Sequence, residues 1–231
     1  MRKAGLFLML ILLSGCNIRV LDPASDTAEK LTDLIYLSFG LMMLVFIVVI
    51  ILFVRFVSKY RDNSESKPRT IKDDKENKWL ELTWTILPFI LLAILAVPTI
   101  KATYDLTSSI SENEEGSSGD EIIIDVEAQR FNWKFTYENG STSYDELVLP
   151  VGKKVKFRLT SKDVIHSFWI PSLAGKIDVI PGKETKLSFR PSDTGTFQGK
   201  CAEFCGAEHA LMRFETRVVS NFEFQQWLKQ E

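Results

Sequence analysis

Soft metal ligands are concentrated in one short segment near the C-terminus. Residues 199–212 contain two cysteines, one histidine and one methionine, which are Cys201, Cys205, His209 and Met212. The sequence has only two histidines, and the other one, His166, lies 35 residues before Cys201. Thiolate, imidazole and thioether together favour copper. Because a mononuclear blue-copper site uses one cysteine, the second cysteine predicts a site with two metal ions.

A disulfide is the alternative for two cysteines spaced as Cys-x-x-x-Cys. It is available if this part of the chain is exported, because disulfides persist outside the cytoplasm. A disulfide gives no reason for His209, four residues after Cys205, or for Met212 beyond it. Met212 alone is typical of a core residue, and His166 alone of a hydrogen-bonded polar residue. Taken together, the five side chains favour metal binding.

Such a ligand set predicts electron transfer. Copper that cycles between Cu(I) and Cu(II) needs ligands that suit both states, and thiolate and imidazole do so. Two thiolates from one loop can bridge two copper ions, with one histidine on each. The sequence indicates no open ligand position for a substrate, so the site is expected to pass single electrons.

The N-terminus predicts export. Arg2 and Lys3 precede an apolar run over residues 4–13, and small residues then lead to Cys16. A short basic region, an apolar core and small residues are typical of a signal peptide, here residues 1–15. The string before Cys16 resembles a bacterial lipobox, so lipidation of Cys16 is expected. An ordinary membrane helix or a chance cysteine is the alternative.

Two apolar stretches predict a membrane anchor over residues 16–107. Residues 34–54 and 82–100 carry no charge over 21 and 19 positions, and about 20 residues suffice to span a bilayer. Transmembrane helices are expected at about 34–57 and 82–103. The alternative is a helical hairpin buried in a soluble protein. Seven basic residues at 58–78 place this segment in the cytoplasm and both termini outside.

The C-terminal half predicts an all-β domain. Residues 108–120 are rich in Ser, Gly and Glu and are typical of a linker. Short strand-like runs follow within 121–231, separated by turn residues, and indicate a sandwich or barrel. They are residues 122–126, 131–137, 155–159, 185–189 and 214–218, with a short helix expected at 221–230.

The chain resembles subunit II of the haem–copper oxidases, of the cytochrome c oxidase type found as bacterial lipoproteins. The resemblance rests on VIHSFWIP at 164–171, KIDVIPG at 176–182 and GKCAEFCGAEHALM at 199–212. It implies a transmembrane helix hairpin followed by a cupredoxin-like Greek-key β domain with the binuclear CuA centre. His166 and His209 would each bind one copper, with Cys201 and Cys205 bridging both.

The resemblance also assigns weaker roles. Met212 would be a weak ligand of one copper, and the backbone carbonyl of Glu203 that of the other. The Glu203 carboxylate would reach a magnesium ion at the border with subunit I; a solvated loop acid is the alternative. Glu81 would lie at the mouth of a proton path, or merely anchor the helix at the interface. Phe131 stands where a tryptophan is expected to accept electrons, and Trp133 keeps the later aromatic position.

The resemblance implies partners. They are oxidase subunit I with its haem, further oxidase subunits, membrane lipid, and cytochrome c as the electron donor for oxygen reduction to water. No Cys-x-x-Cys-His motif for a covalent haem occurs, so a separate donor is expected. A net charge of −2 gives no indication of nucleic-acid binding. The alternatives are a quinol oxidase subunit II, which typically lacks these copper ligands, and a freestanding membrane-anchored cupredoxin carrier or copper chaperone.

Overall fold

A computed structural model describes residues 18–61, 76–111 and 121–230 of the chain. These residues form two compact units. One unit covers residues 33–107, and the other combines the residues up to Thr32 with those from Ser108 onward. Cys16 and the predicted signal peptide lie outside the described residues.

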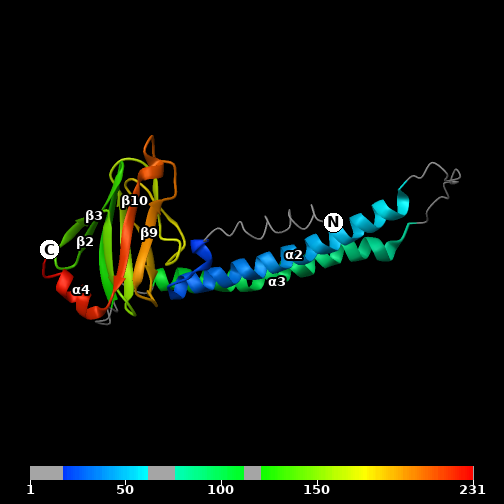
Figure 1. Cartoon of the computed structure of the whole chain (residues 1–231), viewed down its shortest axis with the longest axis horizontal. Coiled ribbons are helices and arrows are strands. Elements are labelled where there is room, and N and C mark those ends of the chain that lie inside the picture. The colour runs from blue at the N-terminus through cyan, green and yellow to red at the C-terminus, as the bar shows by residue number, and fades with distance from the viewer. Residues whose placement is uncertain (1–17, 62–75, 112–120, 231) are drawn as a thin grey trace, which may run out of the picture. The chain divides into compact units, whose positions relative to one another are not determined.

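The first unit consists of long apolar helices. Helix α2 runs from Asp26 to Tyr60 and α3 from Lys78 to Ser111 (Figure 1). Both are long and apolar enough to cross a membrane, and none of either apolar stretch is buried inside the protein. The structure therefore does not show the alternative, a helical hairpin buried inside a soluble protein. Both helices extend past the predicted spans, because helical hydrogen bonding continues into the polar flanks.

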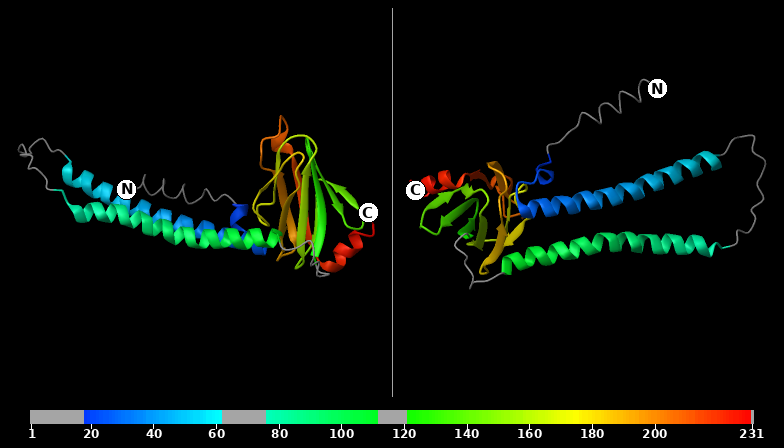
Figure 2. Two further views of the ribbon diagram at one scale, coloured as in Figure 1. Left: turned by 180° about the vertical axis from the view of Figure 1, so that it is seen from behind. Right: turned by 90° about the horizontal axis from the view of Figure 1, so that it is seen from below.

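The second unit is a sandwich of two five-stranded sheets (Figure 2). One sheet has the order β3-β2-β1-β5-β8 and the other β4-β10-β9-β6-β7. The first sheet contains β1 (Glu121–Gln129), β2 (Asn132–Tyr137), β3 (Thr142–Tyr144), β5 (Lys154–Ser161) and β8 (Thr185–Phe189). The second contains β4 (Glu146–Pro150), β6 (His166–Trp169), β7 (Ile177–Val179), β9 (Gly195–Cys201) and β10 (Arg213–Val219).

Alternating side chains explain the sandwich. In β5, Val155, Phe157 and Leu159 are fully buried while the residues between them face outward. On the outer face, β5 pairs in parallel with β1, and Lys154 and Arg158 form ion pairs with the directly opposite Glu121 and Asp125. The Asp125 carboxylate raises the pKa of the Arg158 guanidinium through their hydrogen bond. Opposite charges thus match the register of the two strands.

Stacked aromatic rings fill the space between the sheets. The rings of Phe168 and Phe214 stack with centroids 5.0 Å apart, and Trp133 meets each of them edge-on. A Cβ atom added to Gly199 would lie only 2.1 Å from the Phe214 ring. Gly199 is therefore required by the packing of β9 against this ring. The short helix α4 (Asn221–Trp227), which starts with a capping box, packs by Phe224.

The predicted fold class is confirmed, but the strands were predicted incompletely. All five predicted strand segments are strands, and the predicted C-terminal helix is α4. The sequence analysis did not identify β3, β4, β6, β7 or β9. The strands β6 and β9 are short or contain polar residues, so neither shows the alternation that marks a half-buried strand.

Candidate metal centre

The fold brings the two distant parts of the predicted site together. His166 is the first residue of β6, and Cys201 is the last residue of β9. These strands are antiparallel neighbours, with Phe168 opposite Cys201. The loop after β9 then carries Cys205 and a single 3-10 turn, His209–Leu211, before Met212 leads into β10. Strand pairing therefore positions one half of the site and the loop supplies the other.

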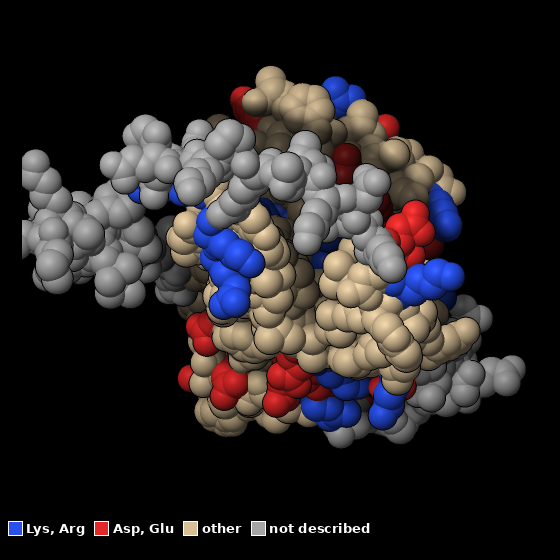
Figure 3. All heavy atoms as spheres, turned by 90° about the vertical axis from the view of Figure 1, so that its right-hand side faces the viewer, with Lys and Arg blue, Asp and Glu red and all other residues tan. Residues whose placement is uncertain are grey.

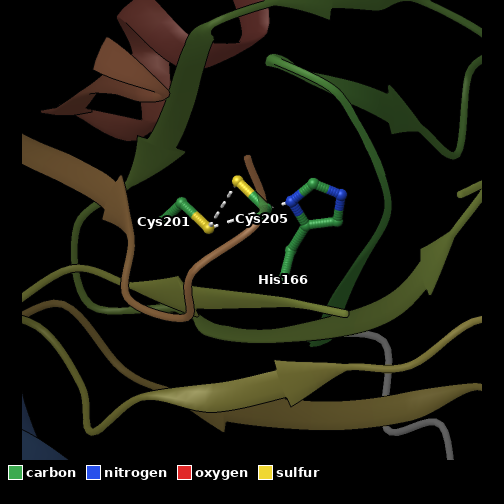
Figure 4. A group of neighbouring side chains, drawn as sticks. All are labelled: His166, Cys201 and Cys205. Atoms are coloured by element: carbon green, nitrogen blue, oxygen red, sulfur yellow. Dashed lines mark hydrogen bonds between the residues drawn. The ribbon is translucent and has the colours of Figure 1, made fainter. Parts of the chain in front are cut away.

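The two sulfur atoms face one another beside the His166 ring (Figure 4). Cys201 Sγ lies 3.9 Å from Cys205 Sγ and 3.8 Å from His166 Nδ1. Both cysteines are free thiols, so the structure does not contain the alternative disulfide. His166 is completely buried and each cysteine is 5% exposed. The sulfur atoms are close enough to share metal ions between them and are shielded from solvent.

The second half of the predicted set surrounds Cys205. Its Sγ atom lies 3.7 Å from His209 Nδ1 and 3.7 Å from the thioether sulfur of the buried Met212. On the other side, the Cys201 thiol donates to the backbone carbonyl of Glu203 at 3.2 Å. Each sulfur therefore has one imidazole nitrogen and one weaker donor atom close by. Six donor atoms of the predicted kinds converge, as a binuclear soft-metal site requires.

The chemistry of the donor set fits copper ions. Burial, followed by the neighbouring Cys201, raises the pKa of the Cys205 thiol to about 11. The raised pKa makes Cys205 a poor nucleophile, but metal ions bind the thiolate and displace its proton. When bound, two copper ions would supply one-electron chemistry shared between both metals, and these thiolates and imidazoles would hold them.

A carboxylate braces the His166 ring. Asp163 Oδ1 lies 2.8 Å from His166 Nε2. Since a carboxylate only accepts hydrogen bonds, the ring proton is on Nε2 and the Nδ1 lone pair is directed to the metal side. Burial raises the pKa of Asp163, but hydrogen bonds from His166 and from the Arg130 and Val164 amides outweigh it and hold the pKa below its usual range.

Asp163 is a residue that the sequence analysis missed. Its other oxygen, Oδ2, accepts from the Arg130 backbone amide at 2.9 Å and from Arg130 Nε at 3.3 Å. The signal available in the sequence is an aspartate three residues before a candidate metal histidine. Metal-bound histidines usually donate their second ring N–H to such a group.

The two predicted aromatic residues both lie next to the site. Trp133 is fully buried and its ring meets His166 edge-on, with ring centroids 6.1 Å apart. Phe131 lies against the loop: a Cβ atom on Gly206 would be 3.2 Å from its ring. Gly206 has a φ of +139°, which favours glycine, and its lack of a side chain allows the loop to pass over Phe131. The sequence analysis did not identify this residue.

The outer edge of the site is apolar and exposed. Phe204 is 77% exposed and Leu211 74% exposed, and both belong to the loop that carries Cys205 and His209. The Phe204 and His209 ring centroids are 5.8 Å apart. Large apolar side chains around a partly exposed ligand are typical of a surface that another protein covers.

Two predicted residues are not part of this cluster. Glu81 is an exposed residue in the first turn of α3, which belongs to the other compact unit. Cys16 lies outside the described residues. The Glu203 side chain is exposed. Among the described residues, the one group of three or more His, Cys, Asp or Glu donors is His166, Cys201 and Cys205, and it contains no carboxylate.

The chain has two helices capable of spanning a membrane, and a two-sheet domain with clustered thiols and imidazoles. These features define a membrane-anchored, cupredoxin-like protein. The family model for "Cytochrome C oxidase subunit II, periplasmic domain" matches residues 124–219. The model for "Cytochrome C oxidase subunit II, transmembrane domain" matches residues 14–102. The chain belongs to the cytochrome c oxidase subunit II family and is membrane-anchored.

Individual relatives agree with this family. The chain is 39% identical over 99% of its length to cytochrome c oxidase subunit 2 of Alkalihalophilus pseudofirmus, of which it covers 67%. It is 31% identical over 97% of its length to quinol oxidase subunit 2 of Bacillus spizizenii, of which it covers 70%. The periplasmic domain of subunit II of Bradyrhizobium japonicum cytochrome oxidase is 32% identical, with a TM-score of 0.46, over 47% of this chain and 91% of that domain. The chain therefore spans about two thirds of the length of these full-length relatives.

Proposed function

We propose that this chain is the electron-accepting subunit of a cytochrome c oxidase. His166, Cys201, Cys205 and His209 would hold two copper ions, with Met212 and the Glu203 carbonyl as weak ligands. Bound copper would supply the one-electron chemistry that links cytochrome c to the haem of subunit I, where oxygen is reduced to water.

One observation carries this proposal. Two buried, unpaired sulfur atoms 3.9 Å apart each have an imidazole Nδ1 within 3.8 Å. A mononuclear site has no use for the second sulfur, and a structural disulfide has no use for the two imidazoles. Because His166 and Cys201 lie on paired strands of the sandwich, their positions should change little between oxidation states, which favours rapid electron transfer.

Copper stoichiometry of the purified full-length chain tests the proposal. We expect two copper ions per chain and, in the oxidised form, one unpaired electron delocalised over both, which electron paramagnetic resonance detects. A stoichiometry of one copper, or a Cys201–Cys205 disulfide that excludes metal, would refute the binuclear site.

The donor and the acceptor are part of the same proposal. Phe131 and Trp133 lie between the protein surface and the site, since Phe131 is partly buried and Trp133 fully buried against His166. They provide the aromatic contact for arriving electrons. The exposed Phe204 and Leu211 provide apolar surface for a protein partner. Purification from membranes, with detection of haem in the co-purified subunits, distinguishes an oxidase subunit from a free carrier.

The remaining assignments concern the membrane. The basic residues at 58–78 support a cytoplasmic loop, with the copper domain on the outer face. Glu81 at the start of α3 would then serve a proton path into subunit I. Lipidation at Cys16 and a magnesium ligand role for the Glu203 carboxylate stay predictions that mass spectrometry of the mature chain and metal analysis of the complex test.

Quinol oxidase subunit II is the second candidate, because relatives of that name are 30–31% identical to this chain. Such a subunit would need no copper ligands. The buried pair of sulfurs with four further donor atoms around it favours the copper-containing branch. Reduction of the copper signal by ferrocytochrome c, but not by a quinol, separates the two candidates.

A further inference from the structure

The N-terminal segment of residues 19–32 is part of the β domain. Ala24 bonds on both sides like a residue in an added strand: its amide donates to Ser172 at 2.7 Å, and its carbonyl accepts from the Ser192 amide at 2.9 Å. Ser25 forms an isolated bridge with Pro191. The sequence analysis assigned this segment to the membrane anchor, whereas in the structure its backbone is hydrogen-bonded to the β domain.

Side chains of this segment are buried against the domain. Ala24, Ser25 and Ala28 are 6%, 2% and 3% exposed. The Ser25 hydroxyl donates to the Leu173 carbonyl and accepts from the Ala28 amide at 3.0 Å. Loosely attached chain ends do not bury hydroxyl groups with both donor and acceptor satisfied, so the docking is specific.

Arg19 connects the two parts of the chain that lead to the metal ligands. Its carbonyl accepts from Ser172 Oγ at 3.1 Å, and its guanidinium donates to Gln198 Oε1 at 2.8 Å. Ser172 follows β6, which begins at His166, and Gln198 lies in β9, which ends at Cys201. Arg19 thus forms hydrogen bonds both to the segment after β6 and to β9, the two strands that carry His166 and Cys201.

The direct connection between these strands is short. β6 and β9 pair through two residue pairs, Phe168 with Cys201 and Trp169 with Lys200, and one further backbone bond joins the Ala202 amide to the Ser167 carbonyl at 2.9 Å. Short ladders open easily unless other contacts hold them. The bonds from Arg19 and Ser25 are placed just beyond the end of this ladder.

We propose that residues 19–32 are an intramolecular clamp that keeps β6 and β9 together and so keeps the metal site closed. Arg19 and Ser25 are positioning residues of the clamp, since neither touches a ligand atom. The consequence for copper retention rests on the proposed function, whereas the consequence for the two thiols does not. An undocked clamp opens the ladder, exposes Cys201 and Cys205, and lets copper leave.

The test uses the full-length, detergent-solubilised chain with Arg19→Ala and Ser25→Ala. In metal-free protein, both variants are expected to react with a bulky maleimide at Cys201 and Cys205 about tenfold faster, as the loss of side-chain hydrogen bonds allows. The copper-loaded variants are expected to lose copper to a Cu(I) chelator faster by a similar factor. Arg19→Lys keeps a donor for Gln198 and should restore slow reaction. Lys30→Ala, at an exposed position of the same segment, is the matched control.

Hydrogen exchange separates docking from its effect on the site. Faster exchange of the Ser192 amide in the variants, together with faster thiol labelling, supports the clamp. Faster exchange at Ser192 with thiol labelling unchanged would overturn it, because docking would then not affect the site. Wild-type chain that binds no binuclear copper would end the proposed function, and the labelling rates of the metal-free protein would still decide on the clamp.

Discussion

The two histidines of the candidate copper site lie in very different surroundings. His166 is completely buried in a strand, and its Nε2 bonds to Asp163 at 2.8 Å. His209 is partly exposed in a 3-10 turn beside the exposed Phe204, and no described residue braces it with a carboxylate. One half of the site is thus built by the sandwich before metal arrives, while the other depends on a loop. An electron carrier gains from this difference, because a rigid half fixes the geometry and an exposed half gives access to a partner.

The largest effect is expected from removing the sulfur on the loop side. Cys205→Ser deletes the atom next to both His209 and Met212 but leaves Cys201 next to His166. We expect copper content to fall from two to at most one per chain, with loss of the delocalised signal. Electron paramagnetic resonance and metal analysis measure this. Cys16→Ser, which removes the one cysteine outside the site, serves as the control, and two retained coppers in Cys205→Ser would contradict the comparison.

A smaller effect is expected from removing the brace on the strand side. Asp163→Asn removes a charge-assisted hydrogen bond, so the metal-free protein should lose about 1.5–3 kcal/mol of stability. For a domain of this size Tm should fall by roughly 5–15 °C. Near-ultraviolet circular dichroism during heating measures it. Glu208→Gln, at an exposed acid beside His209, should leave Tm unchanged; an equal fall would show that the two sides do not differ.

The same brace predicts a pH dependence. Folding lowers the pKa of Asp163, so the unfolded chain binds this proton at about pH 4, above the pH at which the folded chain does. The stabilisation is therefore present above about pH 4 and is lost as pH falls further. The Tm difference between wild type and Asp163→Asn should be constant from pH 7 to 5 and shrink towards pH 3. A difference that grows on acidification would reverse this sign.

A further effect of moderate size is expected in the loop itself. Gly206→Ala places a Cβ atom 3.2 Å from the Phe131 ring at a φ of +139°, and strained backbone of this kind costs about 1–3 kcal/mol. Gly140 also has a positive φ, but a Cβ atom added there has no other atom within 4 Å. Gly140→Ala therefore measures the cost of the strained backbone without a steric contact. Gly206→Ala should lower Tm more than Gly140→Ala, and Phe131→Ala should remove the excess.

The smallest effect is expected at the exposed edge of the loop. Phe204→Ala and Leu211→Ala remove side chains that are 77% and 74% exposed, so stability should change by no more than about 0.5 kcal/mol. The rate of reduction by cytochrome c should nevertheless fall if a partner covers this surface. Stopped-flow reduction measures it, and Phe222→Ala, at another exposed ring, is the control.

The clustering of the candidate ligands and the two helices could be predicted from the sequence because their signals are local. Two uncharged runs of about 20 residues have one physical interpretation, and soft ligands spaced over 12 positions have few. Four of the five strands of the first sheet, β1, β2, β5 and β8, were also found, and β5 shows why: it alternates apolar and polar residues. In contrast, β6 carries buried residues on both faces, and the alternation that identifies a strand is absent there.

Residues that support the site could not be identified in the same way. Asp163 acts because the chain turns at the start of β6 and brings its carboxylate to Nε2 of His166. Gly206 acts because Phe131, from 75 positions earlier, lies beneath it. Ala24 is buried against the β domain, yet it belongs to a segment whose composition is that of an ordinary connection leading into a helix. Each role depends on which segments become neighbours, and neither composition nor periodicity contains that information.

Gly199 shows that one motif can record two unrelated requirements. It opens the segment 199–212, yet its lack of a side chain makes room for the Phe214 ring 2.1 Å from where a Cβ would lie, and it contributes no donor atom. A relative without the copper ligands would still need this glycine to keep its sheets in contact. When chains of this family are sorted into copper-binding and copper-free members, the glycine should therefore be given no weight, and the sulfur and imidazole positions all of it.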